Sequence, residues 1–177
     1  MGAVEERVES LEKVFAQFLR RSEHDARQHS LEMAQIADRV GRFAEDIVAP
    51  NIPRLAREVF GITEVQFSAQ RVEKRQARDA VLFREFDLIL AGQNKLIVVE
   101  TKATARLKYI EEFADVLKEL PDYFPEWKSH SVIPIFASMA IGPDFVKRLT
   151  RLRIYALALG DRTMELLNLG EVSSKRS

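Results

Sequence analysis

Apolar residues recur through the first 47 positions at alternating spacings of three and four, the pattern of a coiled-coil seam. The first stretch of the seam consists of Val4, Val8, Leu11, Phe15 and Phe18. After a polar interruption, the second stretch consists of Met33, Ile36, Val40, Phe43 and Ile47. The pattern predicts one long helix or two stacked helices, with the first stretch projecting and the second packed on a globular domain. We therefore expect a helical, coiled-coil segment at residues 1–30 and a globular domain at residues 31–177.

Beyond the helix-ending Pro50 and Pro53, the apolar positions change to strand-like patterns. A short helix is predicted as far as Gly61, and two further helices at residues 105–124 and 142–152, the first of them amphipathic. Strands are predicted at residues 62–72, 80–90, 95–103, 131–141, 153–159 and 163–169. Together these predict an α/β (α+β) fold with a three-strand antiparallel meander, a crossover helix, a further strand and a small α/β tail.

Composition narrows the class of protein. The chain has 177 residues, 46% hydrophobic and 31% charged, which suits one folded domain with an appendage. No apolar run approaches a membrane span, and the start does not resemble a secretory signal. The absence of cysteine excludes disulfides and thiolate metal sites and favours a cytoplasmic location. Because 27 basic residues balance 27 acidic ones, any DNA binding must come from local patches.

Three charged residues lie at the ends of the most strand-like segments. Asp87 precedes an apolar run, and Glu100 and Lys102 close the next one. Residues two apart on a strand share a face, so Glu100 and Lys102 point the same way. A two-residue loop of Gln93 and Asn94 would place Asp87 opposite Glu100, whereas an odd loop would send it to the other face.

Two carboxylates at such close range repel each other, and their burial is costly unless a cation lies between them. A hard divalent ion such as Mg²⁺ or Mn²⁺ suits oxygen ligands. A neighbouring lysine can orient a water molecule or balance charge on a phosphate. Asp87, Glu100 and Lys102 are therefore the parts needed for metal-assisted phosphodiester hydrolysis.

This motif, an acid, a hairpin turn and then Glu-x-Lys at the end of an apolar strand, resembles that of the PD-(D/E)XK nuclease superfamily. Restriction endonucleases and archaeal Holliday junction resolvases belong to it. The resemblance implies a restriction-endonuclease-like core, a mixed sheet flanked by helices, over roughly residues 35 to 140. The layout also resembles prokaryotic members that have an N-terminal coiled coil and a Phe-Pro stretch, here "DYFPEW". The chain departs from the motif at Phe86, where restriction enzymes have a proline before the first acid.

The resemblance also assigns roles to residues. Asp87 matches the first acid, Glu100 the second and Lys102 the lysine. Glu45, from the first core helix, matches a further acid of the metal site, with Asp46 as its rival. Thr101 would offer its backbone carbonyl to the metal. Glu85 shares a face with Asp87 and is either an accessory ligand or a cross-strand partner of a basic residue.

The predicted function is a Mg²⁺-dependent (or Mn²⁺-dependent) deoxyribonuclease that contacts the DNA backbone without sequence readout. Two basic clusters, at residues 71–79 and 144–153, are candidates for these contacts. The alternative is a catalytically inactive nuclease fold, used for DNA binding or as a coiled-coil scaffold. An apolar stripe on a lone helix needs a partner, so we also expect a homodimer through the N-terminal helix.

Overall fold

The computed structural model describes residues 2–79 and 81–174; the side chains of residues 2–16, 18 and 19 are outside the described part. Helix α1 (Gly2–Val48) is continuous, so the single long helix is the correct alternative of the two predicted. The chain divides into two compact units between Val40 and Gly41. The first stretch of the seam, Val4 to Phe18, lies among the side chains outside the described residues.

The second stretch of the seam is exposed. The exposed fractions of Met33, Ile36, Val40 and Phe43 are 64%, 52%, 47% and 64%. Only Ile47 packs, and only in part, against the core. The predicted burial of this stretch is therefore wrong. Among the described side chains of α1, the first buried one is that of Ala44, and Ile47 and Val48 in the last turn pack in the core.

The remaining elements follow the predicted order. The helices are η1 (Ala49–Asn51), α2 (Ile52–Glu58), α3 (Leu107–Tyr123), η2 (Pro125–Trp127), α4 (Pro143–Arg151) and α5 (Leu169–Ser174). The strands are β1 (Phe67–Arg75), β2 (Phe83–Gly92), β3 (Lys95–Thr101), β4 (Ser131–Ala137), β5 (Tyr155–Leu159) and β6 (Met164–Leu166). Residues 62–66, predicted as strand, precede β1, because the backbone of Glu64 crosses over Gly92 there.

The six strands form one mixed sheet in the order β1-β2-β3-β4-β5-β6. The first three make the predicted antiparallel meander. β4 and β5 then run parallel to β3, and β6 is antiparallel to β5. Helix α3 connects the parallel pair β3 and β4, as a crossover requires. The predicted α+β fold with a central mixed sheet is confirmed.

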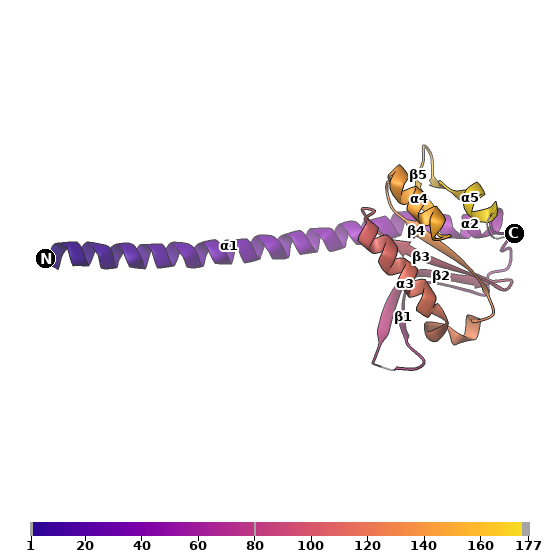
Figure 1. Cartoon of the computed structure of the whole chain (residues 1–177), viewed down its shortest axis with the longest axis horizontal. Helices are drawn as coiled ribbons and strands as arrows, with labels where there is room; N and C mark the ends of the chain where they lie inside the picture. The colour runs from indigo at the N-terminus through magenta and orange to yellow at the C-terminus, as the bar shows by residue number, and fades with distance from the viewer. Residues whose placement is uncertain (1, 80, 175–177) are drawn as a thin grey trace. The chain divides into compact units, whose positions relative to one another are not determined.

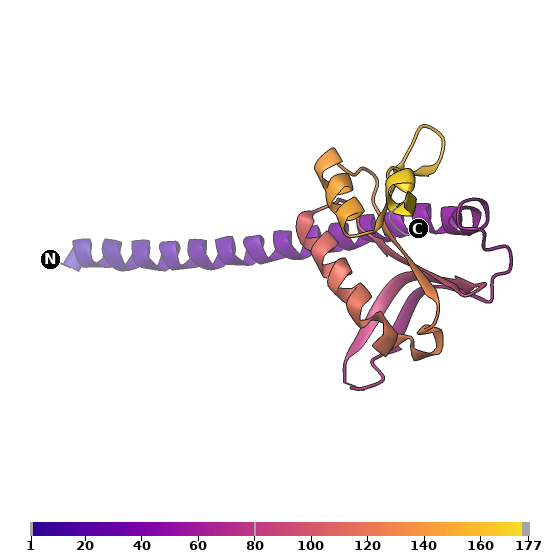
Figure 2. The same ribbon diagram turned by 45° about the vertical axis from the view of Figure 1, so that its right-hand side comes forward.

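Helices cover both faces of the sheet (Figures 1 and 2). One face packs against α3 and α4 around Ile110, Phe113 and Leu149, and we call this the α3 core. The other face packs against the end of α1, α2 and α5 around Val48 and Ile52, and we call this the α2 core. A strand buried on both sides is apolar at almost every position, which explains the continuous apolar runs of β2, β3 and β4.

The β2–β3 turn sets the register on which the candidate site depends. Gly92 pairs with Lys95, so of the two loop lengths considered the two-residue loop of Gln93 and Asn94 is the one present, with φ of 50° and 58°. Such positive values belong to the turns that match the twist of a hairpin. A Cβ added to Gly92 would lie 2.2 Å from the carbonyl oxygen of Glu64, so only glycine fits there.

Candidate active site

Strands β2 and β3 separate just beyond the pair Leu88 and Val99, and Asp87 lies at this point. Continuing the register would place Asp87 opposite Glu100. Instead of a ladder bond, the backbone N–H of Thr101 donates to Oδ2 of Asp87 at 2.6 Å. Thr101 is buried, and a buried N–H needs a partner. The carboxylate is thus fixed in the gap between the two strands.

In β2, the side chains on either side of Asp87 point to opposite faces of the sheet. Phe86 packs in the α3 core and Leu88 in the α2 core, although residues two apart normally share a face. β1 does the same on either side of Arg71, whose φ is 51°. The alternation of faces along a strand therefore does not hold at Asp87. This residue lies between Phe86, which packs in the α3 core, and Leu88, which packs in the α2 core.

The environment of Asp87 works against its negative charge. Burial, and next the charge of Glu100, raise the pKa of Asp87 to about 7. The Thr101 N–H and the charge of Lys102 lower this pKa but do not outweigh them, and Glu45 raises it further. Near neutral pH the carboxyl is thus poised between its two states, as many functional carboxyls are.

Glu100 and Lys102 form an ion pair beside Asp87. Nζ of Lys102 lies 2.6 Å from Oε1 of Glu100, and the two side chains are 33% and 23% exposed. The backbone N–H of Lys102 donates to the carbonyl of Ala137 in β4, which fixes the end of β3. Nζ also lies 5.8 Å from the centre of the Tyr109 ring. Burial lowers the pKa of Lys102, but Glu100 outweighs this, so the pKa is raised and the amine keeps its proton.

Of the two rival acids in α1, Glu45 lies at the site. It lines one small crevice together with Asp87 and Thr101. Its side chain is 20% exposed, whereas that of Asp46 is 69% exposed. Nε of Arg71 donates to Oε2 of Glu45 at 2.8 Å. The prediction considered Arg71 only as part of a basic cluster, because a pairing across 26 positions leaves no signal in the local pattern.

The carboxylates of Asp87, Glu100 and Glu45 are not arranged to coordinate one metal ion together in this structure. Among the described residues, no three His, Cys, Asp or Glu side chains are arranged to hold a metal together. The reason lies in their partners: Lys102 holds Glu100, and Arg71 holds Glu45. Asp87 and Glu100 still fit a hard divalent cation, since they supply oxygen donors and excess negative charge. Glu85 is exposed and lies in register opposite Glu73, another acid, and its charge, after that of Glu45, is one of those that raise the pKa of Arg71 on the same neighbouring strand.

The two basic clusters are largely paired within the chain. In the first, Lys74 pairs with Glu126 and Arg78 with Asp122. In the second, the pairs are Lys147 with Asp144 and Arg148 with Glu111. Several of these side chains are well exposed, so these ion pairs contribute little to stability.

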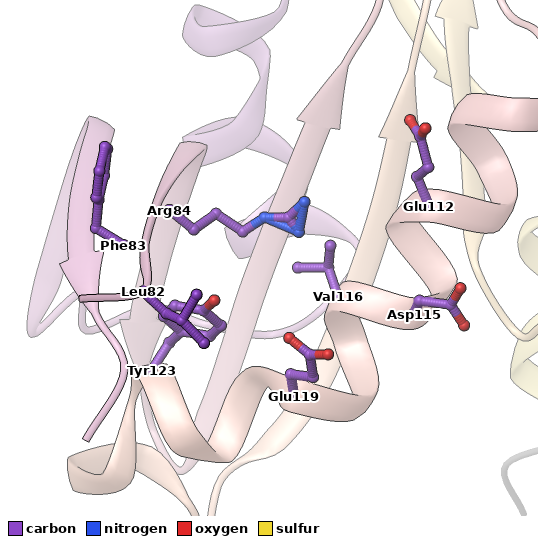
Figure 3. A pocket seen from close by; sticks show the side chains of 8 residues that line it. All are labelled: Leu82, Phe83, Arg84, Glu112, Asp115, Val116, Glu119 and Tyr123. Atoms are coloured by element: carbon purple, nitrogen blue, oxygen red, sulfur yellow. The ribbon is translucent and has the colours of Figure 1, made fainter. Parts of the chain in front are cut away.

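A more open groove lies elsewhere, between the start of β2 and α3 (Figure 3). It encloses about 480 Å³ and is lined by Leu82, Phe83, Arg84, Glu112, Asp115, Val116, Glu119 and Tyr123. Arg84 extends from β2 toward the helix, but three carboxylates of α3 also line the groove. This charge disfavours a DNA phosphate there, so we place the candidate site at Asp87.

No protein-family model matches the sequence, and no curated protein matches it. Several solved structures are similar, and three of them follow. Can2 from Sulfobacillus thermosulfidooxidans, in complex with cyclic tetra-adenylate, has 17% identity and a TM-score of 0.47 over 66% of this chain. A repair endonuclease from Pyrococcus abyssi has 15% identity and a TM-score of 0.39 over 63%. The small subunit of the heterodimeric restriction endonuclease R.BspD6I has 14% identity and a TM-score of 0.37 over 68% of this chain.

The aligned region spans 31%, 46% and 72% of those three chains, so the first two are much longer than the shared part. In the described part of this chain, no helix is long and apolar enough to cross a membrane. The fold is assigned from the order of elements in the chain: a helix, an antiparallel three-strand meander, a crossover helix and a parallel strand. With this order of elements, the chain has a restriction-endonuclease-like fold.

Proposed function

We propose that the chain is a Mg²⁺-dependent or Mn²⁺-dependent nuclease of the PD-(D/E)XK type that hydrolyses DNA phosphodiester bonds. The observation that carries the proposal is the position of Asp87 where β2 and β3 separate, with its Oδ2 held by the Thr101 N–H at 2.6 Å. The pKa of Asp87, which burial and the charge of Glu100 raise to about 7, agrees with a site that favours a cation. Glu100 and Lys102 lie beside Asp87, at the end of the adjacent strand. A restriction-endonuclease-like fold agrees with this proposal without by itself assigning the activity.

In the proposed site Asp87 and Glu100 hold the cation, and Glu45 and the carbonyl of Thr101 are the further candidate ligands. A bound Mg²⁺ would supply an activated water and stabilise charge on the phosphate. The Thr101 N–H keeps Oδ2 of Asp87 in place, which limits the reorganisation needed on binding.

Lys102 has a role that follows from its raised pKa. As an ammonium it donates hydrogen bonds and cannot accept a proton from water. We therefore assign it to orienting the attacking water or neutralising the phosphate, rather than to general-base catalysis. The Tyr109 ring beneath the amine restricts its position.

The first prediction concerns cleavage. With Mg²⁺ or Mn²⁺ the chain should cleave plasmid or oligonucleotide DNA, and Lys102→Ala and Asp87→Asn should each reduce the rate by about 100-fold or more. Lys118→Ala is the matched control, since Lys118 is an exposed lysine on α3 that pairs with Asp115. DNA binding without cleavage by the wild type would support the inactive-scaffold alternative instead.

The second prediction concerns stability and pH. The pKa of Asp87 is about 7 in the folded chain and near 4 in the unfolded chain, so the folded chain binds this proton more tightly. The resulting contribution to stability is fully present below about pH 4 and is lost as the pH rises through about 7. Asp87→Asn should therefore be more stable than the wild type at pH 8, by roughly 1–4 kcal/mol, with the difference shrinking toward pH 4. Urea unfolding at both pH values measures this.

The control for that experiment is Asp144→Asn, because Asp144 is 96% exposed. It should change stability little at either pH. An Asp87→Asn effect that is equal at pH 4 and pH 8 would mean that the Asp87 carboxyl is not strained by its surroundings.

The third prediction concerns assembly. We propose that the chain is a homodimer through α1, because the exposed residues Met33, Ile36 and Val40 recur at spacings of three and four, as the residues of the earlier seam do. Light scattering should give twice the monomer mass for the wild type and the monomer mass for Ile36→Glu with Val40→Glu. Gln35→Glu with Arg39→Glu, off the seam, should remain dimeric. A monomeric wild type would contradict the proposal.

A further inference from the structure

Arg71 has an unusual backbone for a residue within a strand. Its φ of 51° lies in the left-handed region, which residues other than glycine rarely adopt. Its neighbours Gln70 and Val72 pair with Leu88 and Phe86 in one unchanged register, so no residue is inserted at this point. Such strained residues persist only where the surrounding structure holds them, and they cluster at functional sites.

The side chain of Arg71 is directed to α1. Nε donates to Oε2 of Glu45 at 2.8 Å, and a terminal nitrogen lies 3.7 Å from Oδ1 of Asp46. Glu45 lines the crevice that contains Asp87 and Thr101. The guanidinium is therefore bound to Glu45, the acid of α1 that lines the candidate metal site.

Without Arg71, the crevice would contain the two carboxylates of Glu45 and Asp87, which repel each other. Lys102 neutralises Glu100, and Arg71 neutralises Glu45. A charge-assisted bond of this kind is among the stronger ones a protein makes, and the Glu45 side chain is mostly buried. The guanidinium holds Oε2 of Glu45, so a divalent cation that used the same oxygen would have to displace it, and a cation bound at Oε1 would be repelled by the guanidinium at close range.

We propose that Arg71 is a positioning residue that occupies Glu45 in place of the divalent cation and sets the affinity of the site for that cation by competing with it. The inference rests on the proposed metal site and adds a residue to it. On binding the divalent cation, Glu45 exchanges the guanidinium of Arg71 for the cation. The left-handed backbone at Arg71 keeps the competing guanidinium close to the crevice.

The test is calorimetric titration of the full chain with Mn²⁺. Arg71→Gln removes the charge, and we expect Mn²⁺ to bind at least about fivefold more tightly, the lower end of typical couplings between ligands. Arg71→Gly removes the side chain as well, suits a φ of 51°, and should give the same gain in a chain that folds without the strain. Arg71→Lys keeps a competing charge and should remain near the wild type.

Two controls separate competition from a general effect of charge or stability. Arg57→Gln removes another exposed arginine that pairs with an acid, and should leave the Mn²⁺ affinity unchanged. In a Glu45→Gln background, Arg71→Gln should have no effect, because the carboxylate for which the two compete is gone. A purely structural Arg71–Glu45 pair would not produce this dependence.

The outcomes distinguish this inference from the proposed function. Wild-type binding of Mn²⁺ with an unchanged or weaker affinity in both Arg71→Gln and Arg71→Gly would overturn the role of Arg71 and leave the metal site intact. A gain that persists in the Glu45→Gln background would also overturn it. A wild type that binds no Mn²⁺ at all would overturn the inference together with the metal site.

Discussion

The hydrogen bond from the Thr101 N–H to the Asp87 carboxylate joins β2 to β3 at the point where their ladder ends. A buried backbone donor is satisfied there by an acid rather than by a carbonyl group. The acid is thereby held between two strands, in a partly buried position that raises its pKa to about 7. The two-residue turn at Gln93 and Asn94 fixes which residue of β2 reaches this position.

Around Asp87, the other charges are arranged in pairs. Lys102 holds Glu100, and Arg71 holds Glu45, so the two flanking acids are neutralised and the central one is not. This arrangement costs stability at neutral pH, as sites that must bind a charged ligand commonly do. It also explains why the acids cluster without forming a ready-made cage among the described residues. In the proposed function, the bound cation balances the negative charge of Asp87, which no side chain of the site neutralises.

Local patterns predicted what depends on neighbours along the chain. The apolar runs and turn residues of β2 and β3 predicted the strands and the turn between them, but they left the loop length open, and the two-residue loop in the structure is what brings Asp87 to Glu100. The change of face at Asp87 and the left-handed Arg71 were not predictable, because they arise from contacts between strands and with α1. The exposure of Met33 and Phe43 was missed for a related reason: heptad spacing shows that a stripe needs a partner, but not which one.

The central claim is that burial and neighbouring acids disfavour the ionised form of the Asp87 carboxyl, and that a bound divalent cation would stabilise that form. The most direct measurement is an NMR titration of the Asp87 side-chain carboxyl carbon, without and with saturating Mg²⁺. The account predicts a pKa of about 7 without the ion, and a value lower by at least about one unit with it, since a nearby cation favours the charged form. A pKa near that of an ordinary aspartate without the ion, or one that Mg²⁺ does not change, would contradict the account.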